Sequence, residues 1–229
     1  MIDSYKLRRC DRSEHRDAMD DAQIRRGRPA DAPDYAELAL LTAPELLPAL
    51  FGSESNFKKV MRGSFPRTKN PFSFEHSHFI EMGGRTAGMA LALTHDQMSK
   101  EPLRTMMLLL RYLKLSFVTQ IVHLYRSSEI MAQTKEGDYY LASIATYPEF
   151  RGRGLGTRLM DAVEAETRAA GSRRIVLDVE TDNRKAIELY ERLSFGVESK
   201  SPVLRIKHHC FEFYRMTKEL TPAGPGGAA

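Results

Sequence analysis

Apolar and polar residues alternate along the middle of the chain in a pattern that predicts an α/β domain. Short apolar runs of strand length are separated by segments in which apolar residues recur at helical spacing. Two of these runs flank Gly83 and Gly84, a turn typical of a β-hairpin. We expect strands at residues 23–28, 77–82, 86–94, 139–146 and 174–180, and a closing antiparallel pair at 203–207 and 210–216. We expect a first helix that Asp31 or Asp34 caps and that ends at Leu40, and further helices at residues 44–50, 97–133, 157–170 and 184–193.

The longest predicted helix, residues 97–133, lies between the third and fourth strands. Its apolar stripe is most simply explained by packing against the rest of the domain. The ends of the chain have no such pattern, because residues 1–21 are dense in both charge signs and residues 221–229 are rich in Pro, Gly and Ala. We therefore expect one domain at residues 22–220 between two disordered tails. The apolar stripe of the predicted helix at residues 97–133 consists of Met106, Leu109, Leu110, Leu113, Phe117, Ile121, Leu124 and Tyr125.

Composition narrows the class of protein. The 229 residues suffice for one ordinary domain, and 42% hydrophobic with 28% charged residues provide both a core and a soluble surface. With only Cys10 and Cys210, a disulfide scaffold and a multi-cysteine zinc module are ruled out. His76 and His78 would share one face of a strand but have no evident third ligand, so we expect no metal. The net charge of +4 suits an anionic small ligand and is a weak signal for nucleic acid, so we expect no nucleic-acid partner.

No segment has the length and apolar character of a membrane span. The most apolar stretch, residues 106–110, is closed by Arg111, whereas a span needs about 20 nearly uncharged residues. The basic N-terminal residues are not followed by an apolar stretch, so they do not form a secretory signal. We expect a soluble cytoplasmic protein with no membrane partner.

Residues 139–157, YYLASIATYPEFRGRGLGT, carry the strongest chemical signal. The predicted strand is followed by a loop with three glycines and two arginines, and a helix starts at its end. Glycine-rich backbone before a helix presents several N–H groups at the positive end of the helix dipole, which is a ready site for an anion such as pyrophosphate. The residues of this predicted anion site are Arg151, Gly152, Arg153, Gly154, Leu155, Gly156 and Thr157.

Three phosphate-binding motifs could explain this loop. A Walker A loop requires a lysine after its last glycine, and none follows here. The dinucleotide motif G-x-G-x-x-G fits Gly152 and Gly154 but meets Thr157 at its third position, although Asp178 lies about twenty residues further on, as that motif requires. That motif normally follows an early strand, and arginines would be unusual in its tight turn. The third pattern, R/Q-x-x-G-x-G/A, is matched by residues 151–156 in full.

This third pattern resembles the first signature of the GNAT family of acetyl-CoA-dependent N-acyltransferases. Residues 183–195 are similar to the family's second signature, N-x-x-A-x-x-L-Y-x-x-x-G-F, with Ser194 where glycine is usual, and FYRMTK at 213–218 is similar to its final strand. The resemblance covers roughly residues 23–220 and is specific over 139–195. It implies a GNAT N-acetyltransferase domain at 22–220. Its fold would be the acyl-CoA N-acyltransferase fold, a mixed, mostly antiparallel sheet flanked by helices, with a helical insertion at 97–133 between the third and fourth strands.

The resemblance also implies acetyl-CoA as co-substrate and no metal. The pyrophosphate would rest on the backbone amides of residues 151–156, with the Thr157 hydroxyl at the helix cap. The pantetheine arm would pair with the backbone of Ile144 and Thr146, and the strand at 174–180 would splay away to make room. Asn183 is expected near the pantetheine or the acetyl group. Tyr190 matches the tyrosine that hydrogen-bonds the leaving sulfur.

The implied chemistry is direct attack of an amine on the thioester, with the charge on the carbonyl oxygen met by a backbone N–H near Thr146. A phenol, with a pKa near 10, is a weaker acid than a thiol, with a pKa near 8.5, so Tyr190 is better described as a hydrogen-bond donor than as a full acid. The sequence leaves the base open between Asp138, Glu81 and a chain of water molecules.

We expect the acceptor to be a primary amine on a small molecule. A protein N-terminus or lysine is one alternative, and a non-catalytic acyl-CoA sensor is another. The insertion could cover the acceptor site or form the surface of a homodimer. The acyl-chain preference and the oligomeric state stay open.

Overall fold

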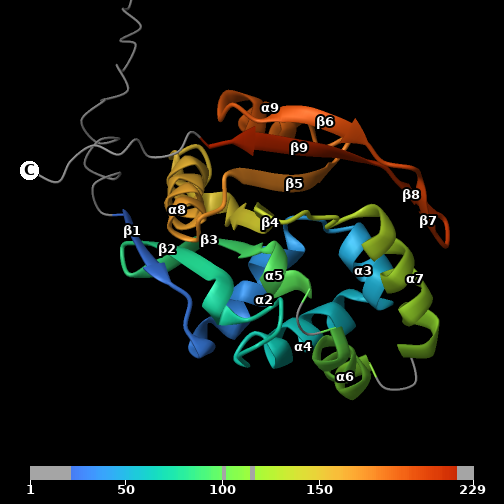
Figure 1. Cartoon of the computed structure of the whole chain (residues 1–229). Helices are drawn as coiled ribbons and strands as arrows, with labels where there is room; N and C mark the ends of the chain where they lie inside the picture. Colours follow the sequence, from blue (N-terminus) through green and yellow to red (C-terminus); the bar gives the residue numbers. More distant parts are fainter. Residues whose placement is uncertain (1–21, 100–101, 114–116, 221–229) are drawn as a thin grey trace, which may run out of the picture.

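A computed structural model describes residues 22–99, 102–113 and 117–220 of the chain, so both predicted tails lie outside the described residues. The main sheet consists of β1 (Ala22–Arg26), β2 (Ser77–Met82), β3 (Arg85–Thr94), β4 (Asp138–Thr146), β5 (Arg174–Glu180), β6 (Gly196–Lys200) and β9 (Phe213–Glu219). Its strand order is β1-β2-β3-β4-β5-β9-β6 (Figure 1). Neighbouring strands are antiparallel except β4 and β5, which are parallel. Two short strands, β7 (Leu204–Ile206) and β8 (His209–Phe211), form a separate hairpin.

Helices cover both faces of the main sheet (Figure 1). The described helices are α2 (Ala32–Leu40), α3 (Leu46–Phe51), α4 (Glu54–Ser64), α5 (His95–Ser99), α6 (Pro102–Leu113), α7 (Phe117–Ile130), α8 (Leu155–Ala169) and α9 (Arg184–Arg192), with short 3-10 turns η1 (Pro29–Asp31), η2 (Phe74–His76) and η4 (Pro148–Phe150). Buried apolar residues of α2, α3 and α4 form one core, which includes the β7–β8 hairpin. Buried residues of α8 pack with Tyr190 of α9 in a second core on the opposite face. The predicted mixed, mostly antiparallel sheet flanked by helices is therefore confirmed.

The C-terminal strands differ from the prediction. Residues 210–216 do not form one strand, because the chain leaves β8 at Phe211 and enters β9 at Phe213. β8 pairs only with β7, whereas β9 joins the main sheet between β5 and β6. The sequence analysis missed β6, because all five of its residues are exposed and the strand therefore has no alternation of buried and exposed positions.

The predicted insertion between the third and fourth strands is confirmed, but it contains α5, α6 and α7 instead of one long helix. α6 lies against α4, and α7 lies against α3 and β7, so the insertion adds to the α2–α4 face of the sheet. Leu109 is buried in this core, with Ile121 and Leu124 packed against it. Other residues of the predicted stripe are exposed, which corrects the packing prediction for Met106, Leu110 and Tyr125; the side chains of Leu113 and Phe117 lie outside the described part.

Helix α9 ends in a hydrogen-bonded cap around Ser194. The amide of Phe195 donates to the carbonyl of Tyr190 at 2.9 Å, and the amide of Ser194 donates to Glu191 at 2.9 Å. Ser194 itself adopts a left-handed conformation, with φ of +67°. This arrangement is the Schellman motif, in which glycine is usual at that position because its backbone enters this region without strain. It brings Phe195 back against Tyr190, with 5.7 Å between ring centroids.

Replacing Ser194 with glycine is expected to raise the free energy of unfolding by about 1 kcal/mol, because the strain of a left-handed residue with a Cβ is removed. Chemical denaturation of both proteins measures the difference. Arg192→Gly is the matched control: it introduces glycine inside the last turn of the same helix and should cost about 1 kcal/mol. A destabilised Ser194→Gly protein would contradict this account of the cap.

Candidate active site

The sheet opens between its two parallel strands. β4 and β5 pair only at Asp138–Arg174, Tyr139–Ile175 and Tyr140–Val176. Beyond Tyr140 the two strands diverge, while β5 stays paired with β9 along its whole length. The predicted splay of residues 174–180 away from the preceding strand is therefore confirmed. The result is a V-shaped gap, closed at Tyr140 and open toward the C-terminal ends of both strands.

The backbone of β4 presents unpaired groups along this gap. The amide of Tyr147 donates to the carbonyl of Ala87 at 2.9 Å, so it faces β3. Because backbone groups point alternately to the two sides of a strand, the N–H and C=O groups of Thr146 and Ile144 face the gap. Ala142 forms a bulge, since Leu141 and Ser143 pair with consecutive residues of β3. The two residues predicted to pair with an extended ligand are thus those whose backbone is open.

The glycine loop follows β4 at the open end of the gap. Gly152 and Gly154 have φ of +76° and +71°, and Gly154 is the N-cap of α8. Among the described residues, no backbone carbonyl accepts a hydrogen bond from the amides of residues 152–157. The helix starts at Leu155, two residues before the predicted start, so Thr157 lies in the first turn of the helix and is not its cap. These free amides at a helix N-terminus form an anion site.

The side chains of the loop leave the amides accessible. Arg151 is exposed, and Arg153 turns back toward the hairpin of β2 and β3, where it lies 6.0 Å from the Phe150 ring centroid and 3.5 Å from the Met82 sulfur. A Cβ on Gly156 would lie 3.6 Å from Leu189 of α9. The end of the loop is therefore next to the helix that carries Tyr190.

Tyr190 lies on α9 and packs in the core that α8 forms on one face of the sheet. It is 8% exposed, and its hydroxyl has no hydrogen-bond partner among the described residues. Burial raises its pKa above the usual range, so the phenol stays protonated and can donate. The Asn183 side chain caps α9 by accepting from the amide of Ala186 at 3.3 Å, and its predicted place near the pantetheine or the acetyl group stays a prediction. The structure thus gives Asn183 a role in holding the helix that carries Tyr190.

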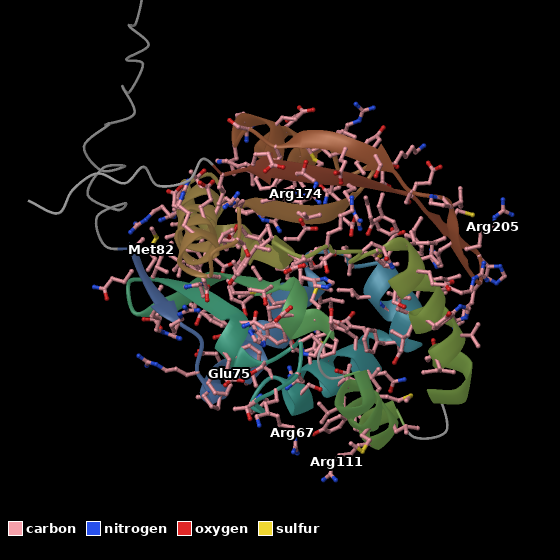
Figure 2. All side chains as sticks on the ribbon, in the orientation of Figure 1. Arg67, Glu75, Met82, Arg111, Arg174 and Arg205 are labelled. Carbon is pink, nitrogen blue, oxygen red and sulfur yellow. The ribbon has the colours of Figure 1, made fainter. Side chains whose placement is uncertain are left out.

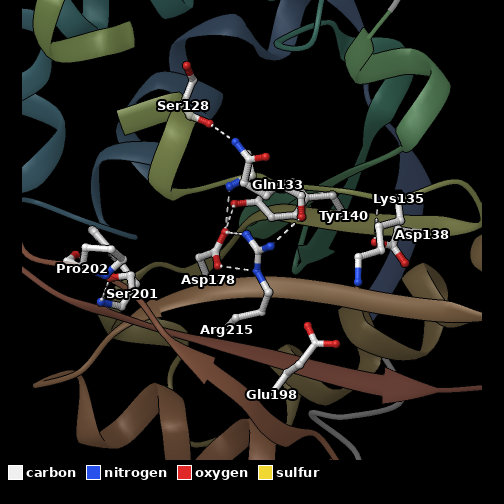
Figure 3. Close-up of polar contacts among 12 residues, drawn as sticks. Ser128, Gln133, Lys135, Asp138, Tyr140, Asp178, Glu198, Ser201, Pro202 and Arg215 are labelled. Atoms are coloured by element: carbon white, nitrogen blue, oxygen red, sulfur yellow. Dashed lines mark hydrogen bonds and ion pairs between the residues drawn. The ribbon is translucent and has the colours of Figure 1, made fainter. Parts of the chain in front are cut away.

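An ion pair joins the insertion to the closed end of the gap (Figure 3). The two oxygens of Asp178 accept hydrogen bonds from Arg215, each at 3.0 Å, and Asp178 also accepts from the Tyr140 hydroxyl at 3.2 Å. The amide of Ala132 donates to Asp178 at 2.8 Å, and the carbonyl of Gln133 accepts from Arg215 at 2.6 Å. Asp178, the acid that the dinucleotide motif would have required, is therefore fully engaged. The end of the insertion is anchored beside the gap.

Two of the base candidates are held in ion pairs. Arg174 binds both oxygens of Asp138, at 2.9 and 3.1 Å, where β4 and β5 begin. Burial alone would raise the pKa of Asp138, but Arg174 and the backbone amide of Lys135 hold it below its usual value. Glu81 accepts from Arg25 at 2.6 Å on the far strand of the hairpin. Each of these two carboxylates therefore has an arginine as its partner. The sequence analysis missed Glu180, at the end of β5.

Arg205 of the β7–β8 hairpin points away from the main sheet (Figure 2). Within residues 22–99, 102–113 and 117–220, no cluster of three or more His, Cys, Asp and Glu side chains is arranged to hold a metal. None of the described helices combines the length and the apolar character that crossing a membrane requires.

Comparisons with known proteins agree with this geometry. A family model described as Acetyltransferase (GNAT) family matches residues 56–195. N-alpha-acetyltransferase 30 of Schizosaccharomyces pombe is 41% identical over 56 residues, which are 24% of this chain and 37% of that protein. Mycothiol acetyltransferase of Corynebacterium aurimucosum is 38% identical over 61 residues, 27% of this chain and 19% of that protein. The chain thus matches well under half the length of either relative.

The fold also has solved counterparts. An N-acetyltransferase from Staphylococcus aureus Mu50 superimposes with a TM-score of 0.64. The superposition covers 86% of this chain and 100% of that chain, and the sequences are 16% identical. At 16% identity, this similarity is evidence for a shared fold and for nothing beyond it.

Proposed function

The chain belongs to the GNAT acetyltransferase family, and from this premise we propose that it transfers an acetyl group from acetyl-CoA to a primary amine. The observation that carries the proposal is the continuity of two open features: the unpaired backbone of β4 leads directly into the free amides of the glycine loop. An extended ligand with an anionic end matches both features.

The residues of the gap fit acetyl-CoA along its length. The amides of residues 152–157 would hold the pyrophosphate, and Arg151 would add positive charge. Ile144 and Thr146 would pair with the amide groups of the pantetheine arm. This arrangement leads the thioester toward the closed end of the gap, where Tyr190 enters from α9. When bound, acetyl-CoA supplies an activated acyl group, and the protein supplies orientation and hydrogen bonds.

The acceptor amine must be deprotonated before it can attack the thioester. An alkylammonium with a pKa near 10.4 must lose a proton before it attacks, which costs about 4–5 kcal/mol at pH 7, whereas an α-amino group costs only about 1 kcal/mol. The neutral amine then attacks the thioester carbon, the C–N bond forms and the C–S bond breaks. Tyr190 donates a hydrogen bond to the sulfur as negative charge develops there.

A small amine is the acceptor that we propose. The two relatives differ, since one is an N-alpha-acetyltransferase and the other a mycothiol acetyltransferase. Support comes instead from the insertion, because Ala132 and Gln133 are tied to Asp178 and Arg215 beside the gap. We expect this segment to restrict the size of an acceptor that approaches the gap from the α2–α4 face, opposite Tyr190.

The direct test is to measure thiol release from acetyl-CoA with a panel of free amines and, separately, with peptides that have free N-termini. Turnover with free amines supports the proposal in full. Turnover with peptides alone would keep the acetyl transfer and replace the acceptor. Tight acetyl-CoA binding without any turnover would point to an acyl-CoA sensor.

Tyr190→Phe is expected to lower kcat about 10- to 100-fold and to leave acetyl-CoA affinity unchanged. The lost hydrogen bond goes to a sulfur that is charged only as the C–S bond breaks, and such bonds contribute about 1.5–3 kcal/mol. Steady-state kinetics together with calorimetric titration of acetyl-CoA separate the two quantities. Tyr214→Phe, on β9, controls for the loss of a tyrosine hydroxyl, and equal rates for Tyr190→Phe and the wild type would remove Tyr190 from the mechanism.

A further inference from the structure

Glu180 has an unusual position among the carboxylates of the sheet. It is the last residue of β5 and is half-buried. Its side chain has no hydrogen bond and no ion pair among the described residues, whereas Asp178, two residues earlier, is held by Arg215. Burying a carboxylate without a partner costs free energy, so such a group in a cleft is a candidate for function.

The strand geometry directs Glu180 toward the acceptor side of the gap. Ile175, Leu177 and Val179 pack in the core with α8. Because side chains alternate between the faces of a strand, Asp178 and Glu180 lie on the other face, where α2–α4 and the insertion pack. Counting the parallel register on from Tyr140 and Val176 puts Glu180 about level with Ile144, across the gap from the open backbone of β4.

The charged groups that act on Glu180 are acidic, and no cation pairs with it among the described residues. Asp182 follows it two residues later in the chain, and Glu45, just before α3, adds a further negative charge that acts on Glu180. Lys200 and Arg215 pair with other carboxylates, Glu212 at 2.7 Å and Asp178 at 3.0 Å, and His209 lies 3.9 Å from Glu45. Burial, together with Asp182 and Glu45, raises the pKa of Glu180 to about 7.

We infer that Glu180 is the base that takes the proton from the ammonium group of the acceptor. This inference rests on the proposed acetyl transfer and names a residue for its first step. The carboxylate accepts one proton and the ammonium becomes a neutral amine. The amine attacks the thioester carbon, and the nitrogen's second proton leaves with the thiol as free coenzyme A. Glu180 then returns its proton to water. A base that titrates close to the working pH is efficient in this role.

Glu180→Gln tests the inference, because it removes the base and keeps the shape. With the best alkylamine found in the panel, kcat/KM should fall about 100-fold or more at pH 7.5. The wild-type rate should rise through a pKa near 7, and that limb of the profile should be absent in the variant. The acetyl-CoA Kd should not change. Thermal unfolding at pH 8 should occur at a higher temperature in the variant, since an unpaired buried charge is gone, which separates a lost base from a lost fold.

Two further measurements sharpen the test. Asp182→Asn removes a neighbouring negative charge, so it should move the acidic limb of the profile to lower pH and keep the plateau rate. A fluorinated analogue of the same alkylamine, already neutral at the assay pH, should lose much less rate in Glu180→Gln than the parent amine does. A purely structural role for Glu180 would affect both acceptors equally.

Two results distinguish failure of the Glu180 role from failure of the proposed acetyl transfer. If Glu180→Gln turns over as fast as the wild type and has the same pH profile, Glu180 is not the base, and the proposed acetyl transfer is unaffected. Absence of turnover in the wild type with every amine and peptide overturns both.

Discussion

Replacing Gly152 with glutamate is expected to weaken acetyl-CoA binding about 100-fold or more. Gly152 has φ of +76°, and no atom of the described residues lies within 4 Å of where its Cβ would be, so a side chain fits there without a clash, on the loop that carries the free amides. A carboxylate on this loop would repel the pyrophosphate, and we expect it to cost at least one charge-assisted hydrogen bond. Such bonds are worth about 1.5–3 kcal/mol each, and 1.4 kcal/mol is a factor of ten in affinity.

Calorimetric titration of acetyl-CoA and coenzyme A into both proteins measures this effect. Gly171→Glu is the matched control, because Gly171 has φ of +74° and equally open surroundings but follows the C-terminal end of the same helix. Both variants bear similar backbone strain and the same added charge. Equal loss of binding in the two variants would show that strain, and not occupation of the loop, is responsible.

Replacing Arg215 with methionine is expected to lower the free energy of unfolding by about 3 kcal/mol. The Asp178 side chain is 3% exposed, and Arg215 is its only cationic partner among the described residues, so its removal leaves an uncompensated buried carboxylate. The usual cost of breaking a buried pair is about 3–5 kcal/mol. We expect the lower end, since the Ala132 amide and the Tyr140 hydroxyl still donate to Asp178.

Urea denaturation of the variants measures this loss. Adding Asp178→Asn to the Arg215→Met protein should recover part of it, because the remaining side chain is then neutral. Lys200→Met removes the cation of the more exposed pair with Glu212 and should cost at most about 1 kcal/mol. A loss no larger in Arg215→Met than in Lys200→Met would show that the Asp178 pair does not hold the insertion in place.

Much of the site was predictable because its parts are local in sequence. The strand, glycine loop and helix are adjacent along the chain, and residues 77–82 and 174–180 match β2 and β5 as predicted. The open backbone of Ile144 and Thr146 follows from a family resemblance and from the alternation of strand groups. Whether these residues bind acetyl-CoA stays a prediction.

The parts that sequence reasoning missed depend on contacts between distant segments. The pairing of Asp178 with Arg215 spans 37 residues, and the anchor at Ala132 spans 46. Nothing in the local pattern distinguishes Glu180, which lacks a partner, from Asp138 or Glu81, which have one. β6 was missed because an exposed strand at the sheet edge has no apolar pattern, and the exposed half of the insertion's apolar stripe shows that helical spacing alone does not assign burial.

The divergence of β4 from β5 creates an edge strand in the interior of a sheet. Unpaired strand edges at a protein surface invite addition of strands from other molecules and lead to aggregation, so most proteins shorten, charge or cover them. Here the open edge of β4 faces β5, which is paired with it at Asp138–Tyr140, so the gap is closed at one end. The sheet therefore keeps a length of strand backbone without a partner inside its own frame, where an incoming strand would have to fit between two strands that are already part of the sheet.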